Sequence, residues 1–274
     1  MFNDFGGRVL TLGIDIGSST SKCAVMKNGS ELLSEAMIPS GTGTSGPARA
    51  LEAVFRGSGL TRTDICASAA TGYGRNSVPD EAALTFSELT CHSKGAAFLC
   101  PGVRTVIDIG GQDSKVLSLS KDGRLVNFVM NDKCAAGTGR FLEVMARILE
   151  LGLDEMGRLD ALAEGRVDIA STCTVFAESE VISRLSQGVN ISDLLAGIHR
   201  SVAVRAASLA RRLGVVEPVF MTGGVSRNGG VLRALGEELG LEVITHEKAQ
   251  LAGAIGAAIC AYEHINNRLK GERQ

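Results

Sequence analysis

Apolar residues recur along this chain with two periods, one typical of helices and one typical of strands. The clearest helical case has apolar side chains at positions 141, 142, 144, 145, 148 and 149, which is the repeat of an amphipathic helix. Further helical patterns cover residues 47–56, 86–99, 175–185, 194–213, 228–239 and 251–262. Short apolar runs typical of buried strands cover residues 9–14, 32–38, 65–70, 105–109, 218–224 and 241–245. The two kinds of element alternate without a low-complexity linker, so the sequence predicts an α/β protein.

One segment of the chain occurs twice. Residues 14–22 read IDIGSSTSK, and residues 107–115 read IDIGGQDSK. In each copy an apolar strand leads to an aspartate and a glycine turn, and a second strand returns, which predicts a β-hairpin with a polar tip. Glycine lets backbone amides approach a phosphate closely, and an aspartate can hold hydrated Mg²⁺ or orient a water. The repeat therefore predicts two related lobes that grip a polyphosphate in a shared cleft.

The candidate nucleotide site follows from these hairpins and from two other glycine-rich turns. Asp15 and Asp108 are the candidates for handling Mg²⁺ or water, although each can also simply cap a turn, and Gln112 is the candidate for positioning the attacking water. Thr138 can also serve as a helix N-cap, and Gly223 can belong to an ordinary strand-to-helix turn. The candidate nucleotide contacts are Gly17, Ser18, Ser19, Thr20, Lys22, Gly110, Gly111, Gly137, Thr138, Gly139, Gly223, Gly224 and Gln250.

Two of the seven cysteines, Cys134 and Cys173, lie just ahead of helical patterns. The positive end of a helix macrodipole favours the thiolate, which is the form that binds metals. The alternative is that both are small buried side chains. The other five lie in apolar strands or helices, where we expect them to pack in the core: Cys23, Cys66, Cys91, Cys100 and Cys260. An odd number of cysteines without framework spacing indicates a reducing compartment.

Composition narrows the classes of partner. The formal net charge is −2, aromatic residues make up 4% of the chain and Trp is absent, so we expect no nucleic-acid partner. No apolar run reaches the roughly 18 residues of a membrane span, and residues 1–7 lack the layout of a signal peptide. We therefore expect no membrane association and a cytoplasmic location.

The hairpins at residues 15–22 and 108–115, with the sequence MTGGV at 221–225, resemble the phosphate and adenosine loops of the actin, Hsp70 and sugar-kinase (ASKHA) superfamily. The sequences DKCAAGTGRFLE around Cys134 and STCTVFAESE around Cys173 resemble the BadF/BadG/BcrA/BcrD ATPase family. Within it, the likeness is to the activators (component A) of 2-hydroxyacyl-CoA dehydratases of the 2-hydroxyglutaryl-CoA type. The resemblance covers nearly the whole chain and implies an ASKHA fold. Its first lobe would span residues 1–100 and its second 101–274, with the C-terminal helix packing back on the first.

The resemblance also implies an activity. Family members are homodimers that hold one [4Fe-4S] cluster at the interface and use ATP to pass a low-potential electron to a partner iron–sulfur dehydratase or reductase. ATP, Mg²⁺ and the cluster are the implied cofactors, and a ferredoxin- or flavodoxin-type protein is the implied electron donor. Since a [4Fe-4S] cluster takes four thiolates, Cys134 and Cys173 from each of two chains would supply them.

Two other classes of function stay open at this point. A small-molecule kinase of the superfamily, of the N-acetylglucosamine or pantothenate type, needs an acceptor pocket and a base, usually an Asp. No spare aspartate lies in a recognisable sugar-binding motif. A non-catalytic iron–sulfur sensor would not require two intact phosphate hairpins. The isolated His92 and His246 are expected to be hydrogen-bonded in place, and the polar loop at residues 71–75 has no assigned role.

Overall fold

The computed structural model describes residues 8–80, 83–131, 135–169 and 173–271. The chain forms two compact units, the first comprising Met1–Pro101 with Leu251–Gln274 and the second comprising Gly102–Gln250. Each unit is built on a five-stranded sheet, with the order β3-β2-β1-β4-β5 in unit 1 and β8-β7-β6-β9-β10 in unit 2. Among the described residues, no helix is both long enough and apolar enough to span a membrane.

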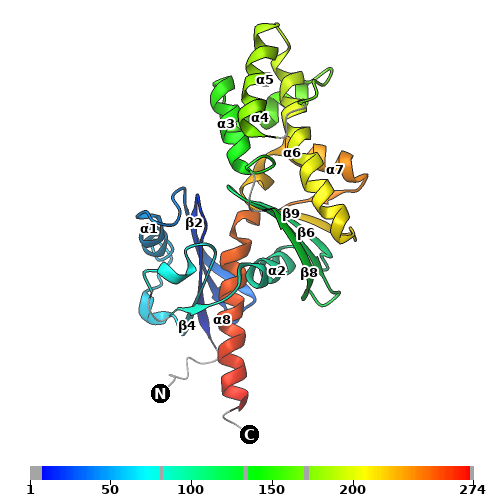
Figure 1. The fold of residues 1–274 in the computed structure, drawn as a ribbon. Helices are drawn as coiled ribbons and strands as arrows, with labels where there is room; N and C mark the ends of the chain where they lie inside the picture. Colours follow the sequence, from blue (N-terminus) through cyan, green and yellow to red (C-terminus); the bar gives the residue numbers. More distant parts are fainter. Residues whose placement is uncertain (1–7, 81–82, 132–134, 170–172, 272–274) are drawn as a thin grey trace. The chain divides into compact units, whose positions relative to one another are not determined.

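Unit 1 contains a β-hairpin followed by a third antiparallel strand and two parallel strands. The strands are β1 (Leu10–Ile16), β2 (Ser21–Lys27), β3 (Glu31–Ile38), β4 (Ala67–Thr71) and β5 (Leu84–Thr85). The helices are α1 (Gly46–Ala53), α2 (Glu88–Leu99) and α8 (Ala252–Gly271). Figure 1 shows α8 running along the sheet, and α2 packs against α8.

The two faces of the unit 1 sheet are covered by different helices. Leu12 and Ile14 of β1 point to one side, where they pack with Ala50 of α1. On the other side, Ala24 of β2 packs with Ala254 of α8. Successive side chains of a strand alternate between the two faces of the sheet. Since Leu12 and Ile14 face α1, the residues between and beside them in β1 face α8.

The close approach of α8 to β1 depends on Gly13. A side chain at this position would overlap the Ala254 carbonyl, and the Thr11 hydroxyl donates a hydrogen bond to the Ala258 carbonyl at 2.9 Å. Asp15 is two residues beyond Gly13, so it shares the face of β1 that α8 covers. The tertiary packing of a C-terminal helix thus reaches the aspartate of the first hairpin.

Unit 2 repeats the sheet plan and adds a helical layer. Its strands are β6 (Thr105–Ile109), β7 (Ser114–Leu119), β8 (Leu125–Asn131), β9 (Val219–Thr222) and β10 (Val243–Ile244). Its helices are α3 (Gly139–Leu149), α4 (Leu153–Leu159), α5 (Thr174–Ser186), α6 (Ile191–Leu213) and α7 (Gly229–Leu239). These helices are labelled together in Figure 1.

The largest core of unit 2 lies between this sheet and its helices. Ile107 and Ile109 of β6 pack in one cluster with Phe141 of α3, Leu194 of α6 and Val231 of α7. The apolar stripe that predicts α3 is the buried side of the helix: its buried residues are Phe141, Leu142, Met145, Ala146 and Leu149.

Each predicted helix and each predicted strand has a counterpart in the structure, and the bounds agree within a few residues except at the end of α8. This helix continues to Gly271, although its pattern predicted an end at residue 262. Strands β5 and β8 and helix α4 were not predicted from the sequence. β8 is an edge strand whose exposed face carries the apolar side chains of Val126, Phe128 and Met130. Its sequence therefore lacks the alternation of apolar and polar residues that marks a half-buried strand.

Candidate functional site

The first hairpin joins β1 to β2 and places Asp15 opposite Lys22. The Lys22 Nζ atom lies 3.0 Å from Asp15 Oδ2, and both side chains are largely buried. The turn closes through the Gly17 amide, which donates to the Thr20 carbonyl at 2.9 Å. Ser19 is exposed at the tip. Asp15 is therefore a buried, charge-paired carboxylate at the base of a glycine turn, not a turn cap on the surface.

The second hairpin, between β6 and β7, has the same construction. Asp108 lies opposite Lys115, with 3.7 Å between Lys115 Nζ and Asp108 Oδ2 and 2.5 Å between Lys115 Nζ and Asp113 Oδ2. The Gly110 amide donates to the Asp113 carbonyl at 2.9 Å, while Gln112 is exposed. Lys115 has only 3% of its side chain exposed, so it is a buried, charge-paired lysine.

A further strand end accompanies each hairpin, and its role was not predicted from the sequence. β4 runs parallel to β1 and places Thr71 beside Asp15, as β9 runs parallel to β6 and places Thr222 beside Asp108. The Thr222 hydroxyl donates to Asp108 Oδ1 at 2.8 Å. The dipeptide Thr-Gly at residues 71–72 and 222–223 is the signal that could have extended the internal repeat to these strands.

The glycine of each Thr-Gly pair is required by its surroundings. Gly72 and Gly223 have φ values of 85° and 83°, in the left-handed region that glycine adopts without strain. A Cβ atom would stand 2.6 Å from Asp15 Oδ1 at the first position and 2.9 Å from Asp108 Oδ1 at the second. The unassigned loop at residues 71–75 is therefore the unit 1 counterpart of the candidate adenosine turn.

That adenosine turn follows β9 directly. Gly224 begins a 3-10 turn, Gly224–Arg227, which leads into α7. A side-chain carbon at Gly224 would lie 3.5 Å from Gln250 Nε2, so the structure brings these two predicted contacts together although they are far apart in sequence. A glycine beside an amide side chain offers a flat backbone surface and a polar edge, which suits a planar base.

The start of α3 and the turn before it are hydrogen-bonded to the second hairpin. The Gly139 amide donates to the Gly110 carbonyl at 2.8 Å, and the Arg140 amide donates to the Gly111 carbonyl at 2.9 Å. The Ser114 hydroxyl donates to the Gly137 carbonyl at 2.8 Å. We call these three contacts the strap. They attach the start of α3 to the loop that is predicted to hold phosphate.

Thr138 occupies the N-cap position of α3, as predicted, but its side chain makes no capping hydrogen bond. Its hydroxyl instead donates to the Ala135 carbonyl at 2.6 Å. The side chain therefore closes the turn that precedes the helix, and the first helical amides are used by the strap.

Cys173 is the N-cap residue of α5 and is exposed. Its carbonyl accepts a hydrogen bond from the Ala177 amide at 2.9 Å. The next two apolar side chains, Val175 and Phe176, are 66% and 70% exposed. Cys134, the other predicted ligand, lies outside the described residues.

The other described cysteines all belong to unit 1 and, unlike Cys173, none of them is exposed. Cys23, Cys91, Cys100 and Cys260 are buried, which confirms the expectation of core packing, and Cys66 is partly buried. Burial, with a smaller contribution from the Asp15 charge, raises the pKa of Cys23 to about 12. Such a thiol stays protonated and is a poor metal ligand.

Two units with the same strand order, each with a buried Asp–Lys pair at a glycine hairpin, define the ASKHA class of nucleotide-binding fold. A ROK family glucokinase from Streptomyces griseus shares this fold with a TM-score of 0.56 at 14% sequence identity, over 93% of this chain and 99% of that chain. At such low identity the likeness concerns the fold alone.

The chain belongs to the BadF/BadG/BcrA/BcrD ATPase family, whose model matches residues 12–261. It is 54% identical over 255 residues to the (R)-2-hydroxyglutaryl-CoA dehydratase activating ATPase of Acidaminococcus fermentans, covering 93% of this chain and 98% of that protein. The solved activator of the 2-hydroxyisocaproyl-CoA dehydratase from Clostridium difficile with bound ADPNP has a TM-score of 0.92 at 50% identity, covering 96% of this chain and 98% of that one. These matches confirm the family resemblance drawn from the sequence.

Proposed function

We propose that this protein is an ATP-dependent reductive activator. In this proposal a homodimer with a shared [4Fe-4S] cluster hydrolyses ATP and donates one low-potential electron to a partner 2-hydroxyacyl-CoA dehydratase or a related reductase. A ferredoxin- or flavodoxin-type protein would resupply the electron. Such a cluster needs a reducing compartment, so the proposal places the protein in the cytoplasm.

The observation that carries the proposal is the strap. The Gly139 and Arg140 amides are bonded to the carbonyls of Gly110 and Gly111, and the segment they begin follows Cys134 within a few residues. A shift of the hairpin tip on exchange of ATP for ADP would therefore pull on the segment that carries Cys134. A nucleotide-dependent phosphate loop joined to a cluster ligand is what coupling between ATP and electron transfer requires.

The nucleotide chemistry would rest on the two aspartates and the glycine turns. Asp15 and Asp108 are carboxylates at the bases of the two hairpins, and oxygen donors of this kind suit hydrated Mg²⁺. Gly17, Gly110 and Gly111 would bring backbone amides to the phosphates, with Ser18, Ser19, Thr20 and Lys22 beside them. Gln112 would position the attacking water. Gly223, Gly224 and Gln250 would contact adenosine.

The cluster would be held by Cys134 and Cys173 of each protomer. Cys173 fits this role because its thiol is exposed at the start of a helix of 13 residues, where the macrodipole stabilises negative charge. When bound, the cluster supplies a one-electron carrier whose potential depends on charge, hydrogen bonds and solvent exposure. The exposed Val175 and Phe176 beside it provide the apolar surface that a second protomer would cover.

The decisive experiment is anaerobic. The protein, reconstituted with iron and sulfide and reduced, is mixed with a purified 2-hydroxyacyl-CoA dehydratase with and without Mg·ATP. We expect electron transfer to the dehydratase only with ATP, accompanied by release of phosphate. Reduction that does not depend on ATP would contradict the proposal. Transfer of the γ-phosphate to an acceptor hydroxyl by a colourless protein would instead establish a kinase.

A further inference from the structure

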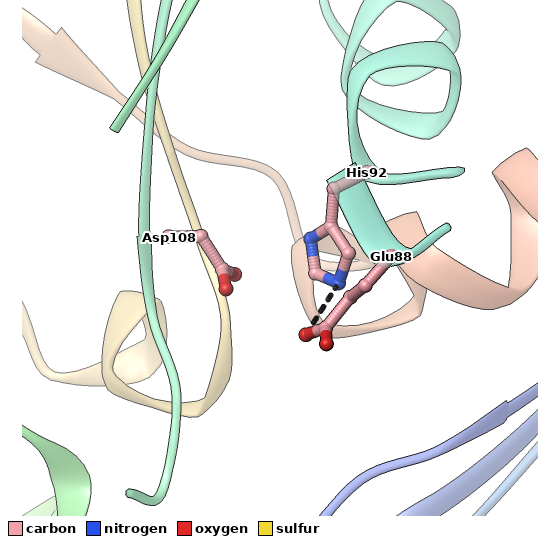
Figure 2. Close-up of side chains that lie close together, drawn as sticks. All are labelled: Glu88, His92 and Asp108. Atoms are coloured by element: carbon pink, nitrogen blue, oxygen red, sulfur yellow. Dashed lines mark ion pairs between the residues drawn. The ribbon is translucent and has the colours of Figure 1, made fainter. Parts of the chain in front are cut away.

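Helix α2 carries an acid–histidine pair, although the sequence predicted an isolated histidine at position 92. Glu88 and His92 are one helical turn apart, and Glu88 Oε1 lies 3.9 Å from His92 Nε2, as the dashed line in Figure 2 marks. The Ser87 side chain caps the helix by accepting a hydrogen bond from the Thr90 amide at 3.2 Å. Glu88 therefore lies in a fixed first turn and places its carboxylate charge beside the imidazole.

The imidazole nitrogen of this pair converges on Asp15. A Cβ atom at Gly253, in the first turn of α8, would stand 2.6 Å from Asp15 Oδ2 and 3.0 Å from His92 Nε2. Both polar atoms thus pack against Gly253, where any side chain would collide with them, and they lie near enough to each other for one water to bridge them. Asp15, Glu88, His92 and Gly253 all belong to unit 1.

The position of His92 is set by direct backbone contact between two helices. A side chain at Gly95 would overlap the Ala252 carbonyl, and one at Gly256 would overlap the Cys91 carbonyl. These two contacts lie on either side of His92 along α2, so the imidazole is held rigidly relative to α8 and β1. Rigid support is what a group that orients a bound water needs.

We propose that Glu88 and His92 complete the nucleotide site at the first hairpin: His92, with the Glu88 carboxylate beside it, holds together with Asp15 a water of the hydrated Mg²⁺ that accompanies the nucleotide. The inference rests on the proposed function, since it presumes a nucleotide at the first hairpin. Mg²⁺ keeps several of its waters and prefers oxygen ligands, so the imidazole acts on a coordinated water and not on the ion. His92 is thus a positioning residue.

The test separates metal-dependent from metal-independent nucleotide binding. Titration calorimetry measures the affinity for ADP in Mg²⁺ and in EDTA for the wild type and for His92→Ala, His92→Gln and Glu88→Gln. In His92→Ala we expect the gain in affinity that Mg²⁺ provides to fall by about tenfold, the scale of a lost outer-shell partner, with the affinity in EDTA unchanged within about twofold. His92→Gln, which keeps a polar atom, should recover part of the loss, and Glu88→Gln should show a smaller loss.

His264→Ala is the matched control because this histidine lies exposed on α8 of the same unit; it should behave as wild type in both conditions. Equal losses in Mg²⁺ and EDTA, or wild-type behaviour of both His92→Ala and Glu88→Gln, would overturn the inference. If His92→Ala fails to fold by circular dichroism, Glu88→Gln decides the matter, because Glu88 is partly exposed in the first helical turn. A wild type that binds no nucleotide would refute the proposed function itself.

Discussion

Asp108 is a carboxylate with only 3% of its side chain exposed, and such a group is stable as an ion only when it is well paired. The Thr222 hydroxyl and the Lys115 ammonium provide that pairing. The first hairpin pairs Asp15 with Lys22 in the same way. Keeping two desolvated charges at glycine turns is costly, and the proposed binding of Mg²⁺ and phosphate would provide a physical reason to keep them.

At this scale we expect Asp108→Asn to reduce ATP hydrolysis by about 10² or more, the size of a lost water-orienting or acid–base contribution. Asparagine retains the shape and can still accept from Thr222, so folding and iron content should not change. A phosphate-release assay with purified protein measures the rate. Asp122→Asn, at an exposed turn residue, is the control, and near-normal turnover in Asp108→Asn would remove this residue from the mechanism.

At the scale of elements, α6, α7 and the 3-10 turn Asp160–Leu162 are joined by a buried polar cluster. His199 is fully buried, with Nδ1 3.2 Å from Asp160 Oδ2 and Nε2 3.1 Å from Asn228 Nδ2. Asn228 caps α7 by accepting from the Val231 amide at 3.0 Å. Since α7 begins next to the adenosine turn, this cluster sets where that turn ends.

The cluster makes stability depend on pH. Burial alone would raise the pKa of Asp160, but the hydrogen bond and charge of His199, with the charge of Arg233, outweigh it and lower the pKa. A carboxylate whose pKa is lower in the folded than in the unfolded protein stabilises the fold fully at pH values above its unfolded pKa of about 3.9. This stabilisation is lost as the pH falls through the pKa of the folded state. We expect Asp160→Asn to lower the free energy of unfolding at pH 7 by about 2 kcal/mol, the cost of breaking a buried charge-assisted bond.

Urea unfolding of both proteins between pH 7 and pH 3 checks this expectation, and the difference between them should shrink below about pH 4, near the unfolded pKa of an aspartate. Asp154→Asn is the control, because its side chain is 81% exposed and an exposed ion pair contributes little. A constant difference across the whole range would show that Asp160 stabilises the fold by packing and not by charge.

The strap leads to a second prediction at the scale of secondary-structure elements. A methyl group at Gly139 would stand 3.1 Å from the Gly110 carbonyl oxygen and 3.4 Å from Gly111 Cα, so Gly139→Ala should push the start of α3 away from the hairpin. Overpacking of this kind costs about 1–3 kcal/mol, and we expect ATP-dependent electron transfer to fall at least fivefold while iron content is retained. Gly152→Ala, whose new methyl would only touch Glu155 Cβ at 4.0 Å, should be neutral.

At the scale of the whole molecule, the count of thiolates tests the assembly. We expect Cys134→Ser and Cys173→Ser to lose most of their iron and become colourless, and Cys260→Ala, at a buried core position, to remain brown. Iron near four per dimer is expected from ligand counting. Anaerobic iron analysis with analytical ultracentrifugation measures both quantities, and four irons per monomer would show that other cysteines bind a cluster.

Coupling is also a property of the whole assembly. If ATP raises the affinity for the partner dehydratase, the partner must raise the affinity for ATP by the same factor, since binding free energies are linked. Anaerobic titration of nucleotide with and without the partner measures this factor. Identical nucleotide affinities together with ATP-independent reduction of the partner would leave a simple ferredoxin-like donor.

Much of this organisation could be predicted from the sequence, because it is written in local patterns. The stripe of residues 141–149, the repeated hairpins and the motifs around Cys134 and Cys173 each depend on neighbours within a few positions. Helix and strand periods and glycine turns are local physics. The duplication, the nucleotide-binding class and the family therefore followed from the chain alone.

Only the tertiary structure decided which distant residues meet. Asp15 and His92 both lie against Gly253, Gln250 lies beside Gly224, and the Gly139 amide is bonded to the Gly110 carbonyl. None of these contacts leaves a periodic trace in the sequence, because each depends on how a helix packs on a sheet formed elsewhere in the chain. A glycine that makes room for a partner far away in sequence looks, in the sequence alone, like any other glycine.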